Sequence, residues 1–564
     1  MEKREENIHT AKQRTTWSAR ENVTLLQAMH AMLTPMMVIA LLLSAVPACI
    51  KAQDKGTLSY YAQMNAIAAD GSHAPYWFTA NRNAISSVDG MNGYARYGMS
   101  YHGDFGKDKS FHYDITADIV AGYGQQSPFM VQQAYADIGW KWLTLSVGSK
   151  ERWSEGEHFM NEATFNEDKT LKRLHYNNFN SLGTGGLTYS GNSRPIPQLR
   201  IEIPDFVEIP GTNGWLKMRA HIAYGMFTDG NYQEEFTRIN PKTHYAHNIL
   251  YHSKAAFINI GKPERFPLTF DGGLEMQTQF GGDIYTHAGG KKLSMPRKPM
   301  DFFKAFIPLS GSDDTPLVEQ TNISGNQLGS WHAAFTYHAG PVDIRVYGEH
   351  LFEDFSQLFF IEYQQNKEGK RRIIYYPWRD IKVGLNIRNK SEFLPFISNI
   401  RYEFLTTEDQ SGALYHDPSE HFNEQMDGCD NYYNHGIYPG WHHWGMGIGN
   451  PLVFSPEYNS NGSTQFRSNR LIAHNIGING RIDGNFPLTY RFNYTYSEHK
   501  GTYQNPFSDK KYTTSLLAEV TYLPRNGRWA GTVSLGYDRS DFIGNNCGIM
   551  LTLTHLGTFF GNKR

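Results

Sequence analysis

Apolar and polar residues alternate along most of the chain from about residue 95 onward. In DIKVGLNIRNK (380–390), Ile381, Val383 and Leu385 fall on one face, while Lys382 and Asn386 fall on the other. Successive side chains of a β-strand point to opposite faces, so this period of two predicts strands. The same period recurs in KWLTLSVGSK (141–150), LTYRFNYTYSEHK (488–500), GTVSLGYDRS (531–540) and GIMLTLTH (548–555).

The alternation by itself fits two architectures. A soluble sandwich turns its polar face to water, whereas a membrane barrel turns its apolar face to lipid and its polar face to the lumen. The expected strands are about nine to fourteen residues long, and we count roughly eighteen, more than a sandwich uses. Aromatic residues such as Trp140, Trp142 and Trp529 gather near strand ends, as in interfacial girdles. We therefore expect an all-β fold: a transmembrane antiparallel β-barrel of about 18 strands with small helical plug elements.

Composition agrees with a barrel and excludes other classes. Aromatic residues make up 14% of the 564 residues and charged residues 19%. A mean hydropathy of −0.53 is too polar for a bundle of membrane-spanning helices. The 53 Lys and Arg residues nearly balance the 55 Asp and Glu residues, giving a net charge of −2. Nucleic-acid binding requires a basic field, so we expect no nucleic-acid partner.

The N-terminal region has the features of an export signal. The apolar run MMVIALLLSAVPACI (36–50) is too short to span a bilayer stably and suits a signal peptide. We expect residues 1–52, including a long polar leader, to be removed after Ala52, leaving one barrel domain over 53–564. Lipid attachment at Cys49 is the alternative, and Met29 or Met32 are alternative translation starts.

Three stretches interrupt the alternation: residues 153–180, 285–328 and 410–464. Long segments of this kind are usually functional, and in a barrel they form plugs or outer loops. The second stretch includes PMDFFKAFIPL (299–309), whose Phe residues fall at helical spacing.

The third stretch contains GWHHWGMGIGNPLVFSP (440–456), which admits several interpretations. Adjacent histidines on a strand point in opposite directions, so a metal site is disfavoured. The glycines do not match a nucleotide-binding spacing, and no βαβ unit surrounds them. Aromatic rings and polar side chains together suit sugars, but the rings can equally pack against each other and close the barrel mouth. The candidate polysaccharide-binding residues are Tyr432, Tyr433, Tyr438, Trp441, His442, His443 and Trp444. We expect no metal and no cofactor.

Residues 181–210 combine close glycines with spaced prolines. Gly183, Gly185 and Gly186 permit either a bend in the wall or close backbone approach to a ligand. The prolines are poor residues for a central strand, so we expect this stretch at a rim or bent inward. They are Pro195, Pro197, Pro204 and Pro210.

Charged residues on the polar faces of the expected strands would project into the lumen. Their mixed signs suit either the lining of a water path or ion pairs across the interior, and since a plugged barrel needs such pairs to hold its plug, we expect pairing. They are Arg345, Glu349, Lys382, Arg388, Arg401 and Glu403.

Catalytic signals are weak. The fragments His252–Ser253 and Ser455 near His443 use residue types too common in this chain to indicate a triad. We expect no catalytic residues and no enzymatic activity.

Four stretches resemble the capsule assembly Wzi family, in the form found in Bacteroidetes. They are APYWFTANR (74–82), SLGTGGLTYSGNSRPIPQLRIEIPDFVEIP (181–210), ISGNQLGSW (323–331) and the GNPL…SP core of 440–456. The resemblance implies an eighteen-stranded barrel of the cell outer membrane, occluded by a small periplasmic helical bundle and by outer loops. It places PMDFFKAFIPL in the plug.

The same resemblance implies a lectin-like, non-enzymatic protein that anchors capsular or other surface polysaccharide. It further implies contact with outer-membrane lipid, and we expect a monomer. The alternative function is a porin-like channel for small solutes.

Overall fold

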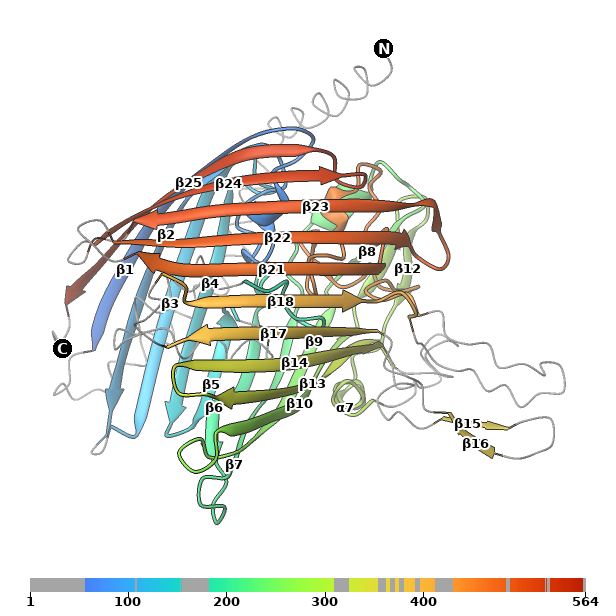
Figure 1. Ribbon diagram of the computed structural model, residues 1–564. Helices are drawn as coiled ribbons and strands as arrows, with labels where there is room; N and C mark the ends of the chain where they lie inside the picture. The colour runs from blue at the N-terminus through green and yellow to red at the C-terminus, as the bar shows by residue number, and fades with distance from the viewer. Residues whose placement is uncertain are drawn as a thin grey trace.

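The computed structural model describes residues 56–106, 109–152, 154, 182–308, 324–353, 362–365, 371–374, 380–390, 396–410, 430–482, 487–522, 524 and 528–560. The expected signal peptide and nearly all of the 153–180 insertion lie outside these residues. Eighteen strands form one antiparallel sheet (Figure 1). The sheet closes because β1 (Thr57–Asp70) pairs with both β2 (Met91–Phe105) and β25 (Asn546–Phe560).

The other strands of the wall pair with their neighbours in chain order, which confirms the predicted all-β barrel. They are β3 (Phe111–Tyr123), β4 (Phe129–Trp140), β5 (Leu143–Ser149), β6 (Gln198–Glu208), β7 (Leu216–Met226), β9 (Leu250–Ile260), β10 (Leu268–Phe280), β13 (Asn326–His338), β14 (Val342–Glu353), β17 (Ile381–Asn389), β18 (Asn399–Thr406), β21 (Arg470–Ile482), β22 (Leu488–Gly501), β23 (Pro506–Tyr522) and β24 (Trp529–Ser540). The described residues contain no apolar helix long enough to cross a membrane.

The wall has its apolar face outside and its polar face inside. On β17, Val383 and Leu385 are exposed, whereas Lys382 and Asn386 are buried. A soluble sandwich shows the opposite arrangement, so the structure decides between the two architectures. A closed sheet with an apolar exterior leaves no unpaired edge in lipid, which is the form that spans outer membranes. The protein is therefore an outer-membrane β-barrel.

The two ends of the barrel differ. The end that carries the C-terminus has short turns, such as residues 141–142 between β4 and β5 (Figure 1). The opposite end carries the long insertions, including a small sheet of β8 (His244–His247), β11 (Asp283–Thr286) and β12 (Gly290–Ser294), and a hairpin of β15 (Glu362–Gln365) and β16 (Arg371–Ile374). Short turns face the periplasm in outer-membrane barrels, so the long insertions face outward.

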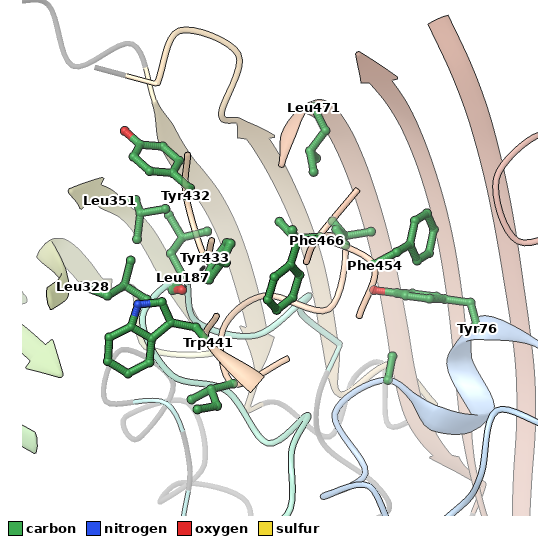
Figure 2. Packing of buried hydrophobic residues seen from close by; sticks show 14 of the residues in the cluster. Tyr76, Leu187, Leu328, Leu351, Tyr432, Tyr433, Trp441, Phe454, Phe466 and Leu471 are labelled. Atoms are coloured by element: carbon green, nitrogen blue, oxygen red, sulfur yellow. Dashed lines mark hydrogen bonds between the residues drawn. The ribbon is translucent and has the colours of Figure 1, made fainter. Parts of the chain in front are cut away.

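Three of these insertions fold back into the lumen and form a plug. They are residues 71–90 with α3 (Tyr76–Thr79), residues 182–197, and residues 430–469 with β19 (His442–His443), β20 (Met446–Gly447) and η4 (Pro456–Tyr458). Their rings, including Tyr76, Trp441 and Phe454, pack with inward-facing Leu351 and Leu471 of the wall (Figure 2). The main hydrophobic core therefore lies inside the barrel.

The expectation that residues 181–210 lie at a rim or bend inward is confirmed for residues 182–197 and is wrong for residues 198–208, which form wall strand β6. Residues 182–196 are almost entirely buried, and β6 begins only at Gln198. The pairing of β6 with β7 shifts register between Ile203 and Val207, around Pro204, which cannot donate to a ladder. Gly185 adopts φ +90°, and a Cβ there would lie 2.8 Å from Asn81 Oδ1. The glycine therefore permits close approach of two plug segments rather than a bend in the wall.

The assignment of PMDFFKAFIPL to the plug is wrong. Residues 299–306 form helix α7 (Pro299–Phe306), but the helix lies on the outside of the wall. Tyr224 Oη donates to Phe302 O at 2.9 Å, and Lys254 Nζ donates to Phe306 O at 2.6 Å. The exposed residues of β7 and β9 are even-numbered, because alternate side chains of a strand face opposite sides of the wall. Tyr224 and Lys254 are even-numbered as well, so both side chains face out of the barrel. The helical spacing of the Phe residues predicted the helix, but it gave no information on which side of the wall the helix lies.

The periplasmic helical bundle implied by the resemblance is not found among the described residues. Helices α3, α6 (Tyr232–Thr237) and α7 all belong to connections at the outer end. Of these, α3 is the helical element of the plug.

Candidate functional site

The aromatic residues predicted to contact sugar lie mostly inside the plug. Tyr432 and Trp441 are 0% exposed, and Tyr433 and Tyr438 are 1% exposed. Figure 2 shows Tyr432, Tyr433 and Trp441 in one cluster with Leu187, Leu328 and Leu351. His442 and His443 are buried as well, and of the seven predicted residues Trp444 alone is partly exposed. The burial of six side chains is what the packing alternative predicts.

Polar side chains of the wall hold the backbone of the plug. Glu353 accepts a hydrogen bond from Tyr433 N at 2.6 Å, and Gln279 donates to Gly440 O at 3.0 Å. Within the plug, Tyr433 Oη donates to Leu187 O at 2.5 Å. A buried loop must satisfy its peptide groups. The polar face of the barrel supplies those partners, which explains how irregular chain can lie inside it.

Ion pairs of inward-facing wall residues continue this support: the predicted charges do pair, but within the wall rather than across the interior. Lys382 lies 2.6 Å from Glu349, and both side chains are 3% exposed. Glu349 also accepts from Leu187 N at 2.6 Å, while Lys382 donates to Gly185 O at 2.7 Å. A nearby carboxylate, Glu403, accepts from Thr184 N at 2.6 Å. The plug is thus bound to the wall through paired charges.

The remaining predicted lumen charges divide into two groups. Arg345 pairs with Asp271 at 2.5 Å, and Arg401 lies 4.0 Å from Glu403. Arg388 is only partly buried near the periplasmic end of β17, where it lies opposite Asp343 of β14.

His443 is fixed as a neutral side chain. Its Nε2 accepts from Thr228 N at 3.2 Å, so Nδ1 carries the proton and donates to Arg194 O at 3.0 Å. Burial lowers the pKa of His443 to about 4 and that of its neighbour His442 to about 3. Since both nitrogens of His443 are occupied, this side chain serves packing and is not placed to ligate a metal. In the part of the chain that the structure describes, no group of three His, Cys, Asp or Glu residues could hold a metal ion.

The two catalytic fragments do not assemble as pairs. His252 lies on the outer face of β9, and its neighbour Ser253 faces the lumen. Ser253 Oγ instead lies 2.7 Å from His221 Nε2 on β7, where both side chains are buried in the wall. Ser455 Oγ accepts from Gly447 N at 2.9 Å and shapes the turn of the plug loop.

Trp444, the predicted residue that solvent reaches, lies at the centre of a small cluster of side chains. The guanidinium of Arg194 lies over the Trp444 ring, with 4.5 Å from Cζ to the centroid. The ring of Tyr232 lies 6.1 Å away, and its hydroxyl donates to Glu457. Gln126, from the loop between β3 and β4, donates to Trp444 O at 2.7 Å. Four outer segments thus meet at one partly exposed indole.

The backbone at Trp444 is held in a conformation that bulky residues avoid. Trp444 has φ +55° and the following Gly445 has φ +74°. The hydrogen bond from Gln126 fixes one side, and Glu457 N donates to Gly445 O at 3.0 Å on the other. A Cβ at Gly445 would collide with the Tyr232 hydroxyl. This constraint presents the indole at the outer surface of the plug.

Sequence reasoning missed the other members of the cluster. Gln126, Arg194, Tyr232 and Glu457 come from separate insertions, and no local pattern connects them. Arg194 lies within the 181–210 stretch, but its importance there depends on Trp444 lying beside it.

Burial shifts the pKa of Arg194, a member of this cluster, and the pKa of Asp229 in opposite directions. It lowers the pKa of Arg194 to about 10, because desolvation outweighs the attraction of Glu457. Burial raises the pKa of Asp229 to about 6, although Gln233 donates to its carboxylate. The cluster therefore combines an aromatic face with a desolvated cation and hydrogen-bonding groups.

Comparisons with known proteins find distant likenesses of fold. No family model matches the chain, and no curated protein matches it. Wzi of Escherichia coli, described as an outer membrane protein involved in group 1 capsule assembly and a carbohydrate-binding β-barrel, is similar at a TM-score of 0.48 and 11% identity over 89% of this chain and 84% of that one. OccK3 of Pseudomonas aeruginosa is similar at a TM-score of 0.44 and 9% identity over 90% of this chain and 96% of that one. OccK5 of the same organism is similar at a TM-score of 0.43 and 8% identity over 90% of this chain and 99% of that one. At these values the likenesses assign no function to this chain.

Proposed function

We propose that this outer-membrane barrel is a lectin-like, non-enzymatic capsule assembly protein of the Wzi type that binds surface polysaccharide at its outer mouth. The observation that carries the proposal is the Trp444 indole, partly exposed beside polar side chains on the outward side of the plug. The resemblance of the plug segments 74–82, 181–210 and 440–456 to that family supports the same function.

The cluster has the chemistry that sugar recognition uses. A pyranose presents a C–H face that stacks on an indole, and its hydroxyls need donors and acceptors. Gln126 and Glu457 provide such groups within the same cluster as Trp444. In this proposal Trp444 contacts sugar, whereas Tyr432, Tyr433, Tyr438, Trp441, His442 and His443 position the loop that presents it.

A porin-like channel is the second candidate, and the plug disfavours it. Plug residues contact the wall around its circumference, including Gln132 of β4, Glu349 of β14 and Glu519 of β23. We expect no open-channel conductance from the full-length mature protein in planar bilayers. Steady currents of porin size would replace the proposed function with solute transport.

The proposed function is tested by Trp444→Ala in the native host. We expect normal insertion of the variant and normal polymer synthesis, with polymer released into the medium instead of remaining attached to cells. Trp215→Ala is the matched control, because that indole is 38% exposed in a turn at the periplasmic end. Retention equal to that of wild type in Trp444→Ala cells would overturn the role of this cluster, and attached polymer in a deletion strain would overturn the function.

A further inference from the structure

Helix α7 covers polar residues on the lipid-facing side of the wall. His252 of β9 is 0% exposed, with its ring 4.5 Å from that of Tyr224 and 5.9 Å from that of Phe306. Lys254 Nζ donates to Ala305 O at 3.0 Å and to Phe306 O at 2.6 Å, which caps the C-terminus of the helix. Such polar groups are costly against hydrocarbon, so the helix is held to the wall by the groups that it shields.

The outer face of α7 is apolar. Met300 is 57% exposed, Phe303 48% and Ile307 41%, and their spacing places them on one stripe. Asp301, Lys304 and Ala305 of the same helix are buried. The stripe lies at the same outer end of the wall as Met226, an outward residue at the end of β7 that is 40% exposed. It therefore continues the apolar belt that meets lipid.

The position of α7 along the wall corresponds to the outer edge of the membrane. Strands β7 and β9 are 11 residues long, and the apolar belt of such barrels is about 25 Å tall. The helix contacts Tyr224, His252 and Thr278, which lie within the last three residues at the outer ends of their strands. This level is the boundary between acyl chains and headgroups of the outer leaflet.

The segment that leads into α7 is basic. Lys291, Lys292, Arg297 and Lys298 are all exposed. Asp283 lies 2.9 Å from Lys291 and 2.5 Å from Arg297, and Asp301 accepts from Lys298 N at the start of the helix. Among the described residues 283–301, cations thus outnumber carboxylates, which favours an anionic group at this level.

We propose that α7 and residues 290–298 form a binding site for a phosphorylated lipid of the outer leaflet. Its acyl chains lie against Met300, Phe303 and Ile307, and its phosphates lie beside Lys292 and Lys298. The site is on the outer wall, so it is separate from the Trp444 cluster and does not depend on the proposed function.

The test measures retention of bis-phosphorylated lipid A by full-length mature protein in mild detergent, using native mass spectrometry. We expect Lys292→Gln with Lys298→Gln to weaken retention at least tenfold, since each basic residue near anionic lipid contributes about fivefold. Phe303→Ser should weaken retention of both lipid A and its dephosphorylated form, whereas the lysine variant should affect the phosphorylated form alone. Lys262→Gln with Arg265→Gln, in the periplasmic turn after β9, is the charge-matched control.

Heat-shifted migration on gels confirms that each variant folds. Equal retention of lipid A by all folded variants would overturn the proposal. Co-purification of a polypeptide that Phe303→Ser abolishes, with lipid retention unchanged, would also overturn it and assign the stripe to a protein partner.

Discussion

The plug loop 430–469 and helix α7 are both aromatic segments inserted at the outer end of the barrel, yet they lie on opposite sides of its wall. Trp441 in the plug loop is 0% exposed, whereas Phe303 in α7 is 48% exposed. The polar lumen face supplies partners for irregular backbone, as Glu353 does for Tyr433 N. The outer face offers Tyr224 and Lys254 as donors to the carbonyls of a short helix whose terminal peptide groups have no partner within the helix. The wall residues that an insertion meets therefore decide which face it occupies.

The largest expected effect comes from breaking the charge pair that supports the plug. Lys382→Ala leaves Glu349 buried without its cation, and we expect a loss of about 3–5 kcal/mol in the free energy of unfolding. Denaturant unfolding in detergent measures it. The matched control is Lys390→Ala, because Lys390 is 34% exposed in its pair with Asp343 and should cost about 1 kcal/mol or less. Equal losses would contradict the view that lumen charges anchor the plug.

Truncating one ring in each segment sharpens the same comparison. Trp441→Ala opens a cavity in the plug core and should cost about 3–4 kcal/mol. Phe303→Ala removes contact mainly with lipid, so the expected loss is below about 1 kcal/mol. Both losses in the free energy of unfolding are calculated from the denaturant midpoints, with the same denaturant slope used for the two variants. A large loss for Phe303→Ala would mean that α7 contributes to the stability of the fold.

A charge on the outer surface tests the depth assigned to α7. Leu551→Arg, on the 48% exposed outer face of β25, should cost about 2–4 kcal/mol in a bilayer, since charge is least tolerated near the midplane. Phe303→Arg should cost about 0–1 kcal/mol at the headgroup boundary. Refolding into liposomes gives both free energies. Comparable costs would place α7 deeper in the membrane than we infer.

Acid should weaken the plug loop. The folded-state pKa of His443, about 4, lies below its ordinary value of 6.5, so the unfolded chain takes up the proton first. The stability is complete above about pH 6.5 and declines as the pH falls toward 4, with a loss of roughly 2 kcal/mol at pH 5. His443→Gln should reduce this decline, as measured by unfolding at pH 7 and pH 5. An unchanged pH dependence in the variant would assign the decline to other groups.

Local alternation was sufficient to predict the strands, whereas the prediction of a barrel also needed their length, their number and the aromatic residues at their ends. The period of two in segments such as 380–390 and 488–500 places alternate side chains on opposite faces whatever surrounds them. Of the predicted interruptions, 410–464 contains a plug segment, and Pro195 and Pro197 correctly indicated chain that bends inward. Pro204 lies instead in wall strand β6, and no interruption marked the plug segment 71–90. These features depend on backbone geometry within a few residues, which the amino-acid sequence carries directly.

Tertiary structure decided on which side of the wall each insertion lies and which residues form the candidate site. The sequence of residues 299–306 predicts a helix with several phenylalanines. The position of this helix outside the barrel depends on Tyr224 and Lys254, which are distant in the sequence. The seven residues near 440 looked equivalent by composition, yet six became core and only Trp444 reached the surface beside Arg194. Burial and contact depend on the whole closed sheet, because closure alone brings segments hundreds of residues apart into one lumen.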